Sequence, residues 1–174
     1  TANIEEAARN TQLSKTSDFG SGCSADGNLI IEESIFDKLV AQLQKEGGHL
    51  ASPAEKELLR KAMWDDERHR TSSTVAIPPQ QLAKIAGFEI PADRKFIMVH
   101  GDGIGKEHHF SGEKLTTLLA LYKYKGFDQA LKMMRAIYEV GGKGHSCGIY
   151  SFDADHIHRL GLAAPVSRIM VRQP

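Results

Sequence analysis

Apolar and polar residues alternate along the chain in two rhythms, one typical of helices and one of short buried strands. Apolar side chains three and four residues apart, together with capping residues, prolines and terminal glycines, mark the helices. Helices are predicted over residues 3–15, 35–46, 53–64, 78–87, 127–140 and 154–163. Short apolar runs mark the strands. Strands are predicted over residues 29–31, 95–100, 118–124, 145–152 and 168–171.

Strands and helices alternate with short connections, most regularly in the last third of the chain. This order is typical of an α/β fold in which parallel strands are covered by helices. We therefore expect an α/β three-layer sandwich with a largely parallel open sheet. The chain has 174 residues, which predicts one domain.

Composition narrows the possible partners. The 22 basic and 22 acidic side chains cancel, and no basic run interleaved with aromatic residues occurs, so nucleic acid is not an expected partner. No apolar run is long enough to predict a membrane span. Two cysteines, Cys23 and Cys147, are too few for a disulfide scaffold and are expected to be reduced thiols. We expect a soluble, cytoplasmic protein.

Cys23 is the first candidate for chemistry. It lies in a loop with Gly20, Gly22 and Gly27, between a predicted helix and a predicted strand. Glycines let backbone N–H groups come close to a thiol, and such a setting raises the thiolate fraction. Cys23 is therefore interpreted as a nucleophile. The alternative is a small buried hydrophobic side chain beside an ordinary loop.

Two further loops carry candidate groups at strand ends. Glu113 comes just before a predicted strand and could accept hydrogen bonds from ribose hydroxyls, or it could be a solvated loop acid. His145 follows a glycine-rich turn and could hold a thiolate or transfer protons. It could equally be a hydrogen-bonded strand residue. Cys147 shares a strand face with His145 and is expected to pack in the core.

Other polar features are given no chemical role. Residues 101–105 are a glycine-rich stretch that lacks the last glycine of a dinucleotide-binding motif, and they are expected to form a surface turn. The charged stretch over residues 65–73 is expected to be a solvated loop. The eight histidines lack acids or cysteines at zinc-ligand spacing, so no metal site is predicted.

Several of these segments together resemble the CoA-acylating branch of the aldehyde dehydrogenase superfamily. The segments that carry the resemblance are residues 13–16, 18–24, 113–122, 126–131, 141–146, 156–157 and 165–171. It covers nearly the whole chain and is weakest over residues 51–110. It implies the fold of the thiol-bearing catalytic domain of that superfamily, over residues 1–174. The expectation is that the dinucleotide-binding domain is missing, so that this part alone would be inactive.

The resemblance also implies a reaction and roles for residues. An aldehyde would be oxidised to an acyl-CoA by NAD or NADP, through a thiohemiacetal and a thioester on Cys23. Glu113 matches the acid that holds the nicotinamide ribose, and His145 matches a histidine near the thiol. The implied substrate is a small aldehyde, with sulfoacetaldehyde first and propionaldehyde, acetaldehyde or succinic semialdehyde behind it. The parent protein is expected to be a homo-oligomer.

Three other functions stay open from the sequence. A hydrolytic aldehyde dehydrogenase would release a free acid in place of a thioester. A relative of the glutamyl phosphate reductases would apply similar thiol chemistry to an acyl phosphate. A non-catalytic α/β domain would contain an unreactive Cys23.

Overall fold

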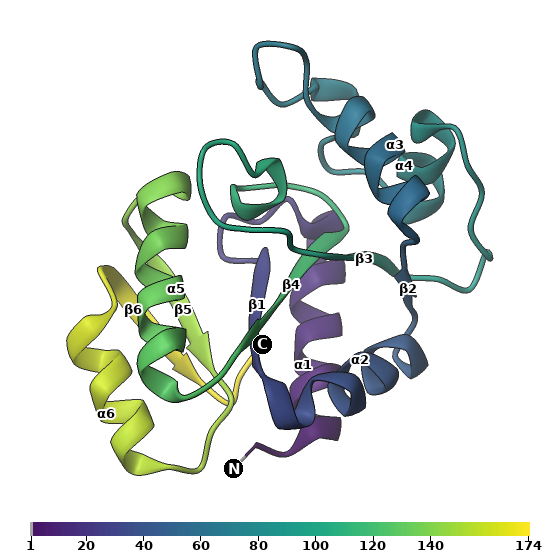
Figure 1. Cartoon of the computed structure of the whole chain (residues 1–174). Coiled ribbons are helices and arrows are strands. Elements are labelled where there is room, and N and C mark those ends of the chain that lie inside the picture. The colour runs from purple at the N-terminus through teal and green to yellow at the C-terminus, as the bar shows by residue number, and fades with distance from the viewer. Residues whose placement is uncertain (1) are drawn as a thin grey trace.

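The structure is a computed structural model that describes residues 2–174 (Figure 1). Its α-helices are α1 (Ile4–Thr16), α2 (Phe36–Lys45), α3 (Pro53–Met63), α4 (Pro79–Ala86), α5 (Phe127–Gly141) and α6 (Ala154–Ala163). Its strands are β1 (Asn28–Glu32), β2 (Gly48–Leu50), β3 (Phe96–His100), β4 (Leu118–Tyr124), β5 (Gly144–Ile149) and β6 (Val166–Val171). Short 3₁₀ turns are η1 (Ser17–Gly20), η2 (Glu33–Ile35), η3 (Ser72–Thr74) and η4 (His109–Ser111).

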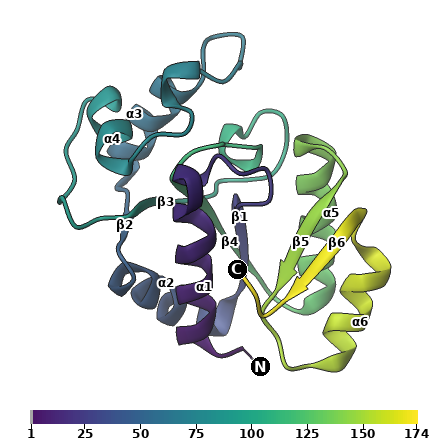
Figure 2. The ribbon, with the colours of Figure 1, turned by 180° about the vertical axis from the view of Figure 1, so that it is seen from behind.

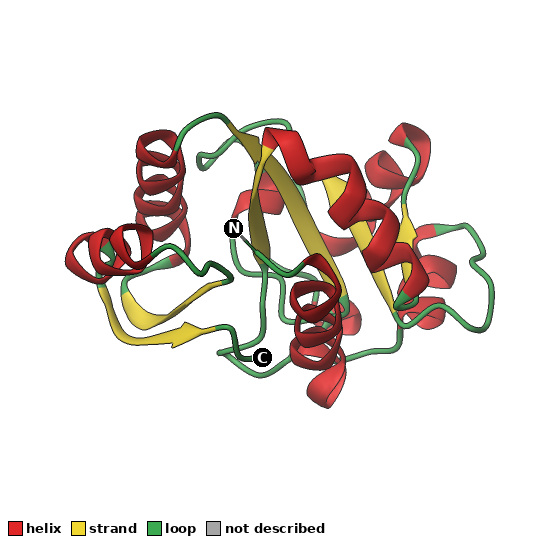
Figure 3. Ribbon diagram, turned by 90° about the horizontal axis from the view of Figure 1, so that it is seen from below, coloured by secondary structure: helices red, strands yellow, loops and turns green. Residues whose placement is uncertain are grey.

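The strands form two parallel sheets. Four strands pair in the order β1, β4, β3, β2, and every neighbouring pair is parallel. The strands β5 and β6 form a separate parallel pair, which Figure 3 shows to one side of the larger sheet. The predicted open parallel sheet is thus confirmed, and the structure divides it into two parts.

Helices cover both faces of the four-stranded sheet, as the alternation of side chains on a strand requires. On β3, Ile97 and Val99 belong to one core with α3 and α4, while Phe96 and Met98 belong to a second core with α1 and α2. Figure 2 shows α1 and α2 on the same face of the sheet, which is the face of the second core. Partly buried side chains of α5 pack against the first core. The predicted three-layer arrangement is therefore confirmed.

Three local features differ from what the sequence predicts or add to it. The strand β2 was not predicted, because its three residues are too few to show a pattern, yet it pairs with β3. Ser34 comes just before the predicted helix over residues 35–46 and was expected to cap it, but it does not cap α2. It lies in η2, where its backbone N–H donates to the Glu32 carboxylate. In the stretch expected to be solvated, the Arg70 guanidinium is partly buried and donates to the backbone carbonyls of Met63 and Lys114.

The tight passage of the chain at Gly20 gives a testable prediction. Gly20 has a φ of +68°, and a Cβ atom there would lie 2.5 Å from the Thr116 carbonyl oxygen. Gly20→Ala is expected to lower the free energy of unfolding by about 2 kcal/mol or more, because strain and a backbone clash add. Urea denaturation measures the change.

Gly22→Ala is the matched control in the same loop. No atom lies within 4 Å of the Cβ position at Gly22, and its φ is not in the left-handed range. We expect this variant to differ from the parent chain by less than about 0.5 kcal/mol. Equal stability of the two variants would contradict the close approach at Gly20.

Candidate active site

The loop that carries Cys23 is fixed at both ends. Before it, Asp18 and Phe19 have positive φ values of 46° and 52°, which turn the chain sharply after α1. Beyond Cys23, the backbone N–H of Asp26 donates to the Ser14 hydroxyl on α1 at 3.1 Å. The loop therefore folds back onto α1, and the Cys23 side chain is exposed at its tip.

Cys23 and His145 meet although 122 residues separate them. The distance between Cys23 Sγ and His145 Nε2 is 2.9 Å. The other ring nitrogen, Nδ1, lies 2.9 Å from the Ser146 hydroxyl, which helps to orient the imidazole. The Ser167 hydroxyl on β6 donates to the His145 carbonyl at 2.8 Å and holds the backbone of that turn. The structure therefore brings a thiol and a base together.

The predicted site residues all lie at amino ends of strands. Cys23 precedes β1, Glu113 precedes β4, and His145 is the second residue of β5. All three residues line one large cavity, with a volume of about 800 Å³. The cavity is also lined by residues of β1, α5 and β5, so it opens between the two sheets. Ligands of open parallel sheets usually bind at the carboxyl ends of the strands, so this site lies at the opposite edge.

A buried lysine beside Glu113 connects the loops of the site. The ammonium of Lys114 donates to Asn28 Oδ1 at 3.0 Å and to the carbonyls of Phe110 and Gly112 at 2.7 and 2.8 Å. Burial holds the pKa of Lys114 well below its usual range. From the sequence, Lys114 is one of three cations, with Lys143 and Arg168, that could face an acidic substrate. The sequence could not show that the Lys114 side chain is buried.

Two ionisable side chains, Lys15 and Asp26, attract each other in the cavity beside the Cys23 loop. Lys15 on α1 is fully buried, and burial lowers its pKa to about 8 although Asp26 and Glu113 attract its charge. Burial likewise raises the pKa of Asp26 to about 6, against the attraction of Lys15. Both side chains line the large cavity. The floor of the site is thus polar, and the charged forms of both groups are disfavoured there.

The expectation that Cys147 packs in the core was wrong. Its side chain is partly exposed and lines the same cavity as Cys23. His145 and Cys147 both line that cavity, as Ser146 between them does, so their shared strand face stays a prediction. Burial raises the pKa of the Cys147 thiol. Both cysteines are free thiols.

The described residues contain neither a metal-binding cluster nor a membrane-spanning helix. Within residues 2–174, no group of three or more histidine, cysteine, aspartate or glutamate side chains could hold a metal ion. No helix in that range is both long and apolar enough to cross a membrane.

Comparison with known sequences identifies relatives. No family model matches the chain. The acylating sulfoacetaldehyde dehydrogenase of Cupriavidus necator is 31% identical over 99% of this chain. The sulfoacetaldehyde dehydrogenase of an Acholeplasma species is 29% identical over 98% of it. The chain spans 35% and 36% of the lengths of these two relatives.

Solved structures agree with the sequences. An acetylating aldehyde dehydrogenase from Geobacillus thermoglucosidasius matches 99% of this chain with a TM-score of 0.95 and 35% identity, and the match spans 38% of that protein. A propionaldehyde dehydrogenase from Rhodopseudomonas palustris, solved with CoA and an acylated cysteine, matches in fold with a TM-score of 0.89 at 22% identity. The fold is thus that of an aldehyde dehydrogenase. Over nearly its whole length, the chain is similar to a part of acylating aldehyde dehydrogenases, as the sequence resemblance indicated.

The two thiols of the cavity are expected to differ in reactivity. Cys23 is exposed, whereas Cys147 is partly buried and has a raised pKa. Because the thiolate is the reacting form, iodoacetamide at pH 7.5 should alkylate Cys23 at least about tenfold faster than Cys147. Peptide mapping by mass spectrometry separates the two rates. Equal rates, or faster alkylation of Cys147, would contradict the geometry.

Stability is expected to depend on pH through Asp26. Its pKa of about 6 in the folded chain exceeds the ordinary value of about 4, so the folded state binds more protons between these pH values. Stability contributed by Asp26 therefore falls as pH rises from about 4 to about 6. The variant Asp26→Asn should not show this decrease. Between pH 4 and pH 6, the free energy of unfolding of the parent chain should therefore fall by more than about 1 kcal/mol relative to that of the variant.

Urea unfolding of both chains at pH 4, 5, 6 and 7 measures this difference. Lys15 stays charged throughout, since its pKa of about 8 lies above the interval, so the loss of its partner shifts the variant by a constant amount. Parallel stability curves for the two chains would refute the elevated pKa of Asp26.

Proposed function

We propose that this chain carries the thiol chemistry of an NAD(P)-dependent, CoA-acylating aldehyde dehydrogenase, with Cys23 as the nucleophile. The observation that carries the proposal is the 2.9 Å contact between Cys23 Sγ and His145 Nε2. Its context is a chain whose relatives are acylating aldehyde dehydrogenases. On this proposal, residues 1–174 are the thiol-bearing domain of the family.

The imidazole and the backbone have separate roles in this proposal. His145 Nε2 accepts the thiol proton, and the Cys23 sulfur adds to the aldehyde carbon, so that a carbon–sulfur bond forms as the carbonyl π bond breaks. The resulting oxyanion needs hydrogen-bond donors. Within the described residues, the backbone N–H groups of Cys23 and Ser24 form no hydrogen bonds, so they are available to it.

The second half of the reaction transfers the acyl group. Oxidation of the thiohemiacetal leaves a thioester on Cys23, and the thiol of CoA attacks its carbonyl carbon. The acyl–sulfur bond to Cys23 then breaks and the Cys23 thiolate leaves. Once His145 has released the proton of Cys23 to solvent, it can accept the CoA proton, since it is in contact with the same sulfur. The exchange of one thioester for another is nearly balanced, which suits a cysteine nucleophile.

Glu113 fits the proposed dinucleotide. Its carboxylate is exposed and lines the same cavity as Cys23, where it can accept hydrogen bonds from ribose hydroxyls. When bound, NAD(P)⁺ would supply the hydride acceptor. A solved glycolyl-CoA reductase of the same fold was engineered and contains bound NADP⁺. We propose NAD or NADP as the cofactor and CoA as the co-substrate.

For the substrate, we propose a small aldehyde, with sulfoacetaldehyde first. Three of the relatives are named sulfoacetaldehyde dehydrogenases, and their substrate carries a sulfonate. An anionic substrate favours a cation in the cavity. Of the cations weighed from the sequence, Lys143 and Lys114 line the cavity, and Lys114 is occupied by its three acceptors. We propose a cytoplasmic homo-oligomer for the parent protein.

The experiment that tests the proposal is acyl transfer from acetyl-CoA to the chain, which needs no dinucleotide. Mass spectrometry should find the acetyl group on Cys23, and Cys23→Ser should abolish it. Cys147→Ser is the matched control and should keep it. His145→Ala should slow the transfer by about a hundredfold, because general-base assistance is lost.

Acetylation that is equally fast without His145, or that occurs mainly on Cys147, would overturn the assignment of the two residues. With aldehyde, NAD⁺ and CoA, the 174-residue chain alone is expected to give little or no turnover. Full parental turnover by this chain would refute that part of the proposal. A free acid as the product of the parent protein, in place of a thioester, would identify a hydrolytic enzyme.

A further inference from the structure

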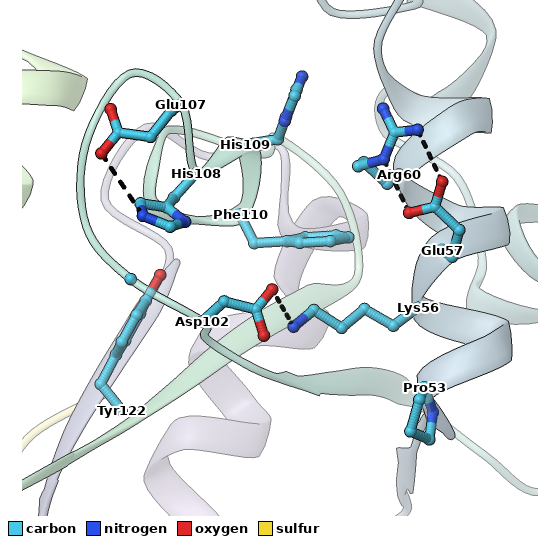
Figure 4. A pocket seen from close by; sticks show the side chains of 11 residues that line it. Pro53, Lys56, Glu57, Arg60, Asp102, Glu107, His108, His109, Phe110 and Tyr122 are labelled. Atoms are coloured by element: carbon cyan, nitrogen blue, oxygen red, sulfur yellow. Dashed lines mark hydrogen bonds and ion pairs between the residues drawn. The ribbon is translucent and has the colours of Figure 1, made fainter.

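A second pocket lies at the other end of the four-stranded sheet from Cys23. It has a volume of about 270 Å³ and lies between α3 and the loop after β3, over residues 101–110 (Figure 4). Its loop leaves the carboxyl end of β3, which is where open parallel sheets usually bind ligands. The proposed reaction uses none of the residues that line this pocket.

A buried hydroxyl without a partner points to a ligand. Tyr122 on β4 lines the pocket and is only 5% exposed, and its hydroxyl has no hydrogen-bond partner among residues 2–174. A buried hydroxyl that stays unpaired is unfavourable by about 1 to 3 kcal/mol. Burial and the charge of Asp102 raise the pKa of Tyr122, so the phenol remains a neutral donor.

The glycine-rich loop holds Tyr122 in place. A Cβ atom at Gly101 would lie 2.1 Å from the Tyr122 ring, and one at Gly103 would lie 2.4 Å from His108 Nε2. The backbone of the loop therefore lies directly on both rings. These contacts explain the glycines at residues 101 and 103, in the stretch that was expected to form a surface turn.

The donors of the pocket lie deeper than its acids. The Lys56 side chain is 15% exposed and projects from the same face of α3 as Arg60, one turn away. Lys56 Nζ is paired with Asp102 at 2.5 Å, and the Asp102 side chain is 72% exposed. Glu57 and Glu107 are exposed as well. Figure 4 shows Asp102 reaching Lys56 from the glycine-rich loop, below the Phe110 ring.

We propose that this pocket binds a small oxyanion, such as a phosphate, sulfonate or carboxylate group, which takes hydrogen bonds from Tyr122 and Lys56. Charge-assisted hydrogen bonds from lysine and arginine suit such groups. In the free protein, the Asp102 carboxylate occupies the position beside Lys56 Nζ that the anion would take. Because Asp102 is mostly exposed, it can turn into solvent when an anion binds. This site is independent of the proposed dehydrogenase chemistry.

The test is titration of the 174-residue chain with inorganic phosphate, at ionic strength held constant with sodium chloride, followed by NMR chemical shifts. Saturable shifts are expected for the amides of the loop over residues 101–110. Lys56→Met should weaken binding at least about tenfold and Tyr122→Phe about threefold or more, because each removes a donor. Asp102→Asn should strengthen binding several-fold, because it removes the competing carboxylate.

Lys61→Met is the matched control, since Lys61 lies on α3 but does not line the pocket. It should leave phosphate binding unchanged. Circular dichroism checks that each variant is folded, and the gain expected from Asp102→Asn cannot arise from misfolding. No saturable shift in the parent chain, equal weakening by Lys61→Met, or weaker binding in Asp102→Asn would each overturn the proposal.

Discussion

The buried ammonium of Lys114 is the contact on which the geometry of the candidate active site depends. Its three hydrogen bonds join Asn28, at the start of β1, to the carbonyls of Phe110 and Gly112. Asn28 returns a hydrogen bond to the Ser111 carbonyl at 3.1 Å. The strand β1 follows the Cys23 loop, and β4 follows Glu113. The hydrogen bonds of Lys114 and Asn28 therefore fix the segments before these two strands to each other. A buried charge is tolerated only when such acceptors surround it.

The thiol and the imidazole come from different sheets, which gives the site its particular character. Cys23 precedes a strand of the four-stranded sheet, and His145 belongs to the two-stranded sheet. Their contact is therefore sensitive to how the two sheets lie relative to each other. The large cavity occupies the space between these sheets, so a molecule bound there would contact both.

The two ends of the four-stranded sheet differ in chemistry. At the amino ends of the strands, Cys23 and Glu113 border a large cavity that is also lined by Lys15 and Asp26. At the carboxyl end of β3, a small pocket combines Tyr122 with the ion pair of Lys56 and Asp102. The topology makes both possible, since parallel strands bring the loops at each end together.

The sequence by itself determined the helices and most strands, because periodicity, caps and glycines act locally. A capping box at Ser52 begins α3, and Gly87 ends α4. The sequence also supplied Cys23, Glu113 and His145 as candidates, from local patterns and from the family resemblance. Only the tertiary structure decided that Cys23 and His145 touch, that Lys114 is buried and that Cys147 faces a cavity. These contacts join residues far apart in the chain, and local patterns carry no information about such distances.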